Sequence, residues 1–389
     1  MTRTARVLGL TLASALTAAA LSVTGSSVGA DPAPQDAAPR MTAGDGQTPS
    51  GDVRRMVYVG NNWAGTADLV APGSFERKAR LDIVPDKDER MAEILGSPDR
   101  LAYFLAVREA IGEGHDQFVD DMYSTNDGTM LIVSRPSFAD VVAISLRTKR
   151  IVWRFKVDGY RSDHMAISPG GRRILHASIG MVYSPLDQPE VDPTKQERVL
   201  QIVDAETFEV LRRINVRKAL DDRGLTWVSH AVRPLTLSPD EQRLYFQVSF
   251  FHGFFEMSRR TGRITRVKRL PNLVPDTPRE QYLLDSAHHG IAMNPAGTRI
   301  CVAGTMSDYA TVVDRRTLER GKLLRGGEKP YWVTPSEDGR SCYISWSGSD
   351  KVSRISYATG RITKSVKVGD HPQRIRNGFL AAGYLRHLR

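Results

Sequence analysis

The sequence predicts an all-β fold, a β-propeller built from four-stranded antiparallel blades. The clearest unit is 329–369, in which four short runs of alternating apolar residues are separated by turns rich in Ser, Asp and Gly. The same order of strands and turns recurs along the chain. Because four strands in about 40 residues cannot bury both faces of their sheet alone, the units are expected to pack against one another.

Six units can be counted, with seven blades as the alternative. The five complete units span 115–157, 163–216, 229–270, 287–326 and 329–369. The segment 56–84 matches only the last three strands of a unit, and 370–380 supplies a matching first strand. Terminal strands that share one blade close the ring without an open edge, so we expect one propeller domain over 53–389.

One segment of that domain departs from the repeat. Residues 85–114 carry apolar side chains at helical spacing, among them Met91, Ile94 and Leu95. This spacing predicts a helical insertion at about 85–114 in preference to a seventh blade.

The start of the chain predicts export. Arg3 and Arg6 precede an apolar run that ends in the small residues Val28, Gly29 and Ala30, as in a secretory signal peptide. We expect a Sec-type signal at 1–30, a disordered linker at 31–52 and a secreted protein. No other apolar run approaches the length that spans a membrane, so no membrane insertion is expected.

The surplus of positive charge predicts the kind of ligand that the protein binds. The 389-residue chain has 54 Lys and Arg and 44 Asp and Glu, and loss of Arg3 and Arg6 leaves a surplus of eight positive charges. The surplus favours a polyanionic ligand of the cell envelope or a small anionic molecule, unless it is spread evenly over a large surface. No long basic run interleaves with aromatic residues, so no nucleic-acid partner is expected. We expect a monomer.

The two cysteines are expected to be unbridged. Aligning the repeats on their turns matches Ile300, and not Cys301, with Cys342. The two thiols would then point to opposite faces of neighbouring sheets.

The repeat resembles the YVTN-type (YncE-like) β-propeller family. The resemblance rests on Gly369 with Pro372, on Pro330 with Asp338-Gly339, on 203–207 (Val-Asp-Ala-Glu-Thr), and on Val313-Asp314 with Thr317. It implies a propeller, usually of seven blades. It does not imply one function, because such propellers serve binding, lactone hydrolysis and redox chemistry alike.

Four insertions are expected on one rim of the propeller. They lie at 85–114, 182–198, 217–228 and 271–286. Loops alternate between the two rims, and by the repeat register all four share the rim at which the first strands begin. Long loops gathered on one face of a rigid scaffold often carry function.

Histidines at that rim predict a metal site. The candidate ligands are His164, His288, His289 and His371. Neutral imidazoles from several blades suit copper, zinc or iron, so a transition metal is the expected cofactor if there is one. Hydrogen-bonded loop histidines are the alternative.

The same rim offers a metal-free interpretation. Arg233, Lys329 and Arg135 could hold a carboxylate or phosphate, with Trp63, Trp346 and His252 as further ligand-binding residues. His289 would then be the catalytic base of a lactonase-like hydrolase or lyase. A non-catalytic extracellular interaction module is the third hypothesis. The usual hydrolase, metalloprotease and nucleotide-binding motifs are absent, so the sequence leaves open whether the protein is an enzyme.

Overall fold

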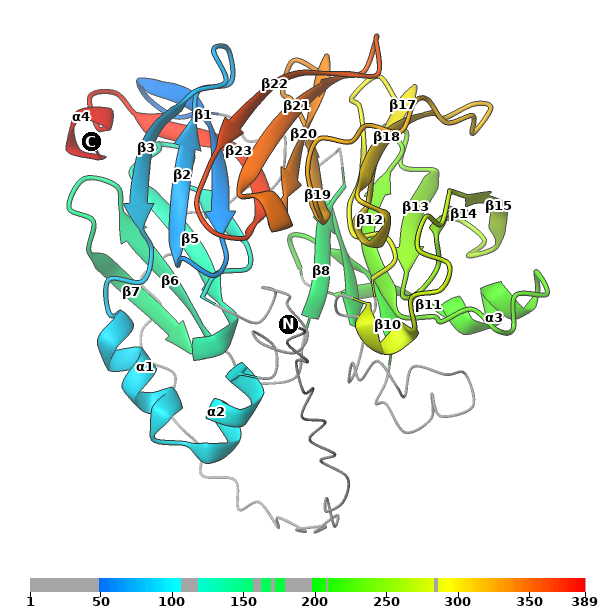
Figure 1. Cartoon of the computed structure of the whole chain (residues 1–389), viewed down its shortest axis with the longest axis horizontal. Helices are drawn as coiled ribbons and strands as arrows, with labels where there is room; N and C mark the ends of the chain where they lie inside the picture. Colours follow the sequence, from blue (N-terminus) through cyan, green and yellow to red (C-terminus); the bar gives the residue numbers. More distant parts are fainter. Residues whose placement is uncertain are drawn as a thin grey trace, which may run out of the picture. The chain divides into compact units, whose positions relative to one another are not determined.

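The computed structural model describes residues 49–105, 118–156, 162–168, 172–178, 198–207, 209–282 and 286–388. Within them, six antiparallel sheets form the blades of a propeller ring, which confirms the predicted fold class and the count of six (Figure 1).

Each blade is a meander that starts at its innermost strand. Blade 1 contains β23 (Pro372–Ala381), β1 (Val53–Asn61), β2 (Thr66–Val70) and β3 (Arg77–Asp82). Blade 2 contains β4 (Met122–Ser124), β5 (Met130–Arg135), β6 (Asp140–Ser145) and β7 (Ile151–Lys156). Blade 3 contains β8 (Ser162–Ile167), β9 (Arg173–Ser178), β10 (Val199–Asp204) and β11 (Val210–Ile214).

The second half of the ring repeats this plan. Blade 4 contains β12 (Val232–Leu237), β13 (Arg243–Val248), β14 (Gly253–Ser258) and β15 (Ile264–Arg269). Blade 5 contains β16 (Ile291–Met293), β17 (Arg299–Gly304) and β18 (Tyr309–Asp314). Blade 6 contains β19 (Pro330–Pro335), β20 (Ser341–Trp346), β21 (Lys351–Ser356) and β22 (Arg361–Lys367). In blade 5, the bridges Ala310↔Leu324 and Val313↔Arg320 replace a regular fourth strand.

The predicted ring closure is confirmed. β23 pairs with β1 from Val53↔Ala381 to Asn61↔Pro372, so strands from the two ends of the propeller share blade 1. The pairing satisfies the backbone groups of the inner edge of β1, which would otherwise be open.

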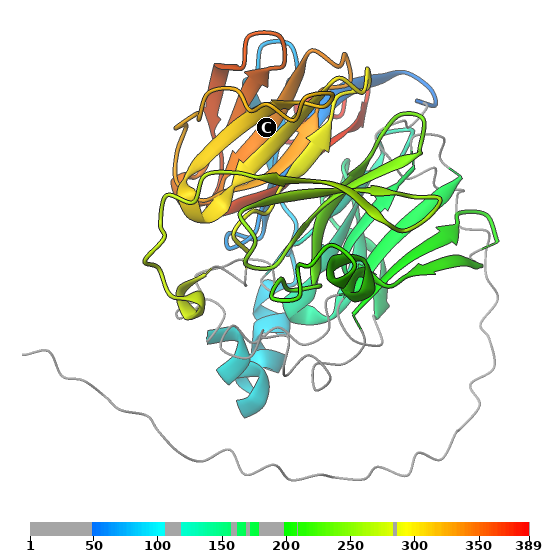
Figure 2. The same cartoon turned by 90° about the vertical axis from the view of Figure 1, so that its right-hand side faces the viewer.

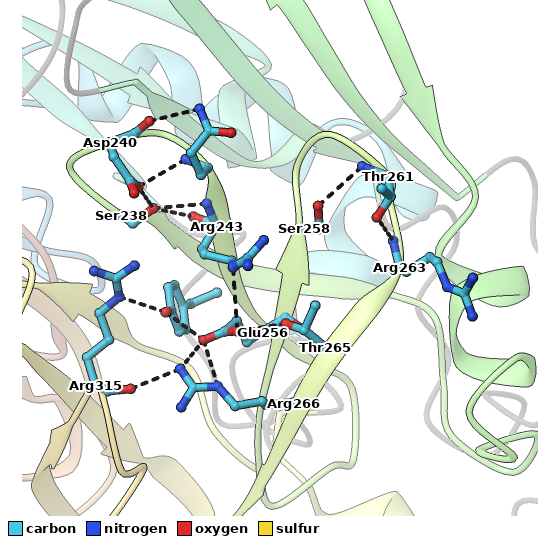
Figure 3. Close-up of polar contacts among 12 residues, drawn as sticks. Ser238, Asp240, Arg243, Glu256, Ser258, Thr261, Arg263, Thr265, Arg266 and Arg315 are labelled. Atoms are coloured by element: carbon cyan, nitrogen blue, oxygen red, sulfur yellow. Dashed lines mark hydrogen bonds and ion pairs between the residues drawn. The ribbon is translucent and has the colours of Figure 1, made fainter.

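The turns between first and second strands share one hydrogen-bond pattern. In blade 4, the Ser238 hydroxyl accepts from the Arg243 N–H at 2.9 Å, and Asp240 accepts from the Gln242 N–H at 3.1 Å (Figure 3). Ser336 and Asp338 make the same contacts in blade 6. Thr125 and Asp127 make them in blade 2. Short side chains that bond the nearby backbone in this way fix a tight turn, and this explains why a Ser-x-Asp or Thr-x-Asp motif marks these three blades.

The core lies between the blades. Consecutive residues of β13 illustrate this, because Phe246 packs toward blade 3 and Tyr245 toward blade 5. Further apolar clusters join blades 1 and 2, blades 5 and 6, and blades 6 and 1. Successive side chains of a strand point to opposite faces of the sheet, so a blade such as blade 4 packs against both of its neighbours.

A buried polar contact also connects blades 4 and 5. Glu256 of β14 accepts hydrogen bonds from Tyr245 and Thr265, both at 2.7 Å, and pairs with Arg266 (Figure 3). Arg315, just after β18 of the next blade, donates to the Tyr245 hydroxyl at 2.8 Å. The network satisfies a carboxylate that is almost fully buried, as a buried charge requires.

The prediction that the cysteines are unbridged is wrong. Cys301 of β17 and Cys342 of β20 form a disulfide, with their Cα atoms 6.6 Å apart. The expected opposite orientation of the two thiols is what brings them together. Blades pack face to face, so a side chain on one face of blade 5 meets a side chain on the opposite face of blade 6.

Three α-helices lie where the chain passes from one blade to the next. α1 (Lys87–Leu95) and α2 (Pro98–Leu105) follow β3, and α3 (Val216–Asp221) follows β11. The segment 271–286, which contains the 3-10 helix η5 (Arg279–Gln281), follows β15. Figures 1 and 2 show α1, α2 and α3 at the same end of the blades. Of the insertion at 182–198, only Arg198 belongs to the described residues.

The described residues form four further short helices. α4 (Leu385–Leu388) follows β23 and buries Leu388 in the cluster of blades 1 and 2. Short 3-10 helices join second and third strands in three blades, η2 (Pro136–Phe138), η7 (Thr305–Ser307) and η8 (Ser347–Ser349). In the part of the chain that the structure describes, no helix is long and apolar enough to cross a membrane.

Candidate functional site

A repeated aspartate fixes the start of two first strands at the loop rim. After η7, Asp308 accepts a hydrogen bond from the Lys329 N–H at 2.7 Å, and after η8, Asp350 accepts one from the His371 N–H at 3.1 Å. All four residues have left-handed backbone conformations, with φ between 49° and 52°. Asp and Asn tolerate this region better than other non-glycine residues, so the aspartates also suit their position in the turn.

His371 lies in a small group of potential metal ligands. Its Nδ1 is 2.7 Å from Asp370 Oδ1, and its ring stacks on Trp63 with centroids 3.6 Å apart. Single ligand atoms of Asp350, Asp370 and His371 all lie within 4.8 Å of one another. We call these three residues the rim triad. Among the residues that the structure describes, no other group of three His, Cys, Asp or Glu side chains meets this distance.

His288 and His252 form a second feature of the same rim. Their ring centroids are 5.4 Å apart, and the rings are nearly perpendicular. His288 Nε2 lies 3.0 Å from the Tyr309 hydroxyl, and His252 Nε2 lies 3.0 Å from the Tyr282 hydroxyl. His288 is fully buried and His252 partly exposed. The insertion at 271–286 contributes Tyr282, so this predicted loop reaches the histidines.

His289 points into the packed interior. Its ring stacks on Tyr331 with centroids 4.0 Å apart, and its backbone N–H donates to Thr305 at 2.9 Å. The next residue, Gly290, allows the close approach, because a Cβ atom there would lie 2.8 Å from the Tyr331 carbonyl oxygen. His288, His289 and His371 therefore do not gather in one metal-ligand group, since each turns toward a different aromatic partner. The side chain of His164, on β8, lies outside the described residues.

The predicted anion-binding residues are divided between interior and rim. Arg135 is fully buried, and its guanidinium bonds Asp140 at 2.7 and 2.6 Å and Asp86 at 2.6 and 3.2 Å. Arg233 is buried and donates to Ser249 at 3.0 Å. A buried cation of this kind is stabilised by its internal partners, so neither arginine is presented to a ligand in this structure.

The predicted aromatic residues divide in the same way. Trp346 is fully buried and donates from its indole N–H to Ser353 at 2.9 Å. It packs in the cluster of blades 5 and 6, where its function is structural. Trp63, His252 and Lys329 are all partly exposed and remain at the rim.

The sequence analysis missed a charged cluster on the innermost strands. Arg374 of β23 lies with its guanidinium carbon 3.9 Å from the ring centroid of Trp332 and pairs with Asp120 at 2.9 Å. Arg376 pairs with Asp121 at 2.6 Å. Burial alone would raise the pKa of Asp121, but attraction to Arg376 and hydrogen bonds from it lower that pKa to about 2. Arg374 and Arg376 occupy alternate positions of the predicted first strand at 370–380, and this pattern could have indicated the charged cluster.

His252 and His288 are expected to make stability depend on pH. Burial lowers the pKa of His252 from 6.5 to about 4, and burial together with the charge of His252 holds the pKa of His288 well below its usual value. Both rings therefore take up protons on unfolding between about pH 6.5 and pH 4. Above this window the two histidines do not reduce the free energy of unfolding. As the pH is lowered through the window, the free energy of unfolding decreases by about 1.4 kcal/mol per pH unit for each proton taken up.

Urea unfolding of chelator-treated protein across this window measures the dependence. The His252→Gln variant should show a slope smaller by about one proton. An unchanged slope in that variant would contradict the assignment.

Comparison with known proteins identifies a similar structure but no family. No protein-family model matches the chain, and no curated protein matches it. A solved structure similar to the chain is Kuenenia stuttgartiensis hydrazine synthase, at 13% sequence identity and a TM-score of 0.44. The alignment covers 81% of this chain and 84% of that chain. The resemblance to YVTN-type propellers stays a prediction.

Proposed function

We propose that this chain is an exported β-propeller that binds a divalent transition-metal ion at the rim triad, Asp350, Asp370 and His371. The observation that carries the proposal is that one ligand atom from each residue lies within 4.8 Å of the other two. One imidazole and two carboxylates form a mixed nitrogen and oxygen donor set, which suits zinc, iron or manganese.

Neighbouring contacts support the triad as a binding site. The stack on Trp63 orients the His371 ring, and the bond from the His371 N–H orients Asp350. A bound ion would take the place of the contact between His371 Nδ1 and Asp370 Oδ1. Three protein ligands leave a coordination position for water or a small anionic ligand, and hydrolytic chemistry would start from such a water.

Export is the second element of the proposal. The predicted signal at 1–30 supports it, and so does the disulfide between Cys301 and Cys342, because disulfides persist mainly in oxidising compartments. Processing of the chain expressed in a bacterial host, read by mass spectrometry of the secreted product, tests this element. Intact residues 1–30 on a protein retained in the cytoplasm would contradict it.

Zinc titration of the chelator-treated protein tests the metal site. We expect binding that is at least tenfold weaker in His371→Ala, because one of three ligands is lost. His387→Ala is the matched control, since His387 is an exposed histidine on α4. Zinc affinity that is the same in His371→Ala and in the unaltered protein would overturn the rim triad.

A further inference from the structure

The hydrogen bonds around His288 fix which of its ring nitrogens carries the proton. The Tyr309 hydroxyl has one proton, which it donates to the Pro271 carbonyl oxygen at 3.0 Å. It must therefore accept from His288, whose Nε2 lies 3.0 Å away. A neutral His288 with its proton on Nε2 has a lone pair on Nδ1. Burial keeps this ring neutral because it lowers the pKa of His288.

That lone pair has no partner in the described structure. His288 Nδ1 is buried, and no hydrogen-bond donor of the described residues reaches it. The Nδ1 atom of His252 is likewise buried without a hydrogen bond among these residues. Buried polar atoms are usually paired, so two such atoms on adjacent rings call for an explanation.

The spacing of the two rings suits a shared ion. Two imidazoles on one tetrahedral zinc ion, each at about 2.0 Å, bring their ring centroids to roughly 5 Å from each other. The centroids of His252 and His288 are 5.4 Å apart. The tyrosine hydroxyls on both Nε2 atoms correspond to the second-shell contacts that fix the tautomer of metal-bound histidines.

We propose that His252 and His288 form a separate metal site, which binds an ion of the zinc class through their two Nδ1 atoms. The site shares no residue with the rim triad, so it stands whether or not the triad binds metal. His252 is partly exposed and gives the ion access from the loop rim. Two protein ligands leave coordination positions for water or for a small ligand with oxygen or nitrogen donors.

The test uses the full chain with His371→Ala, so that the rim triad cannot contribute. We expect this protein to bind one equivalent of Zn²⁺ in a competition titration against a chromophoric chelator. Adding His252→Gln or His288→Gln should weaken binding at least tenfold, and adding both should abolish it. Glutamine keeps an N–H that can donate to the tyrosine hydroxyl, which favours a folded variant.

A tyrosine variant separates metal ligation from a merely structural effect. Tyr309→Phe removes the acceptor that fixes the His288 tautomer, and losses of this kind typically reduce metal affinity about 10- to 100-fold. Tyr58→Phe is the matched control, because Tyr58 is also buried and loses one hydrogen bond, to the Phe379 carbonyl oxygen. It should leave zinc affinity unchanged.

Two results would overturn the second site. One is the absence of zinc binding in the His371→Ala protein. The other is binding that neither glutamine variant weakens while both remain folded by their urea unfolding midpoints. Binding lost in His371→Ala alone would support the rim triad and reject the histidine pair, so the two proposals fail separately.

Discussion

A chain that ends at Gly369 is expected not to form a cooperatively folded propeller. It lacks β23, the innermost strand of blade 1, and with it the buried side chains of Ile375, Phe379 and Leu380. Truncating one large buried apolar side chain typically costs 2–5 kcal/mol, so losing three costs about 6–15 kcal/mol, which is comparable to the roughly 5–15 kcal/mol by which native proteins are stable. Circular dichroism with urea unfolding measures the outcome.

Two further samples make this experiment specific. A chain that ends at Gly383 keeps β23 and loses only α4, so it should unfold cooperatively at a moderately lower midpoint. A peptide of 370–389 added to the truncated chain should restore a cooperative transition by pairing with β1. If the chain ending at Gly369 has the same urea unfolding midpoint as the full chain, ring closure by β23 does not stabilise the propeller.

Replacing Cys301 and Cys342 by alanine is expected to lower the free energy of unfolding by about 4 kcal/mol. The disulfide joins blades 5 and 6 across a sequence separation of 41 residues, and closing a loop of this length restricts the unfolded chain. Both sulfur atoms are also buried in the core between these blades, so their removal cannot stabilise the packing there.

Reduction of the unaltered protein provides an independent measurement. Urea unfolding with a thiol reductant should lower its stability by a similar amount, whereas the double-alanine variant should not respond to the reductant. Equal unfolding midpoints of the oxidised and reduced proteins would contradict a stabilising bridge.

The fold was predictable because its signals are local. A turn between first and second strands recurs in each complete unit of the sequence, and a turn such as that of Ser336 and Asp338 is fixed by contacts within five residues. The number of these turns predicts the number of blades. The missing first strand in the unit at 56–84 predicts that the two ends of the propeller share one blade. The prediction about the cysteines is wrong although the repeat alignment places the two thiols on opposite faces, as the structure does. Those two faces lie against each other because neighbouring blades pack face to face, and the alignment does not contain this information.

The site was less predictable, because a repeat register assigns a residue to a strand position but not to a partner. Arg135 is the last residue of β5, next to the expected loop, yet its carboxylate partner Asp86 comes from the helical insertion, which no repeat alignment covers. His252 and His288 meet through a tertiary contact between blades 4 and 5. Asp350 joins His371 because it follows η8, a position that the alignment had not associated with the histidines.

The pairing of β1 with β23 also sets the order of events during synthesis. β1 leaves the ribosome more than 300 residues before its partner, and Val53 can meet Ala381 only after the residues between them have been made. Until then the first blade lacks its inner strand, and the ring cannot close. The nascent chain therefore stays open from the synthesis of β1 to the synthesis of β23.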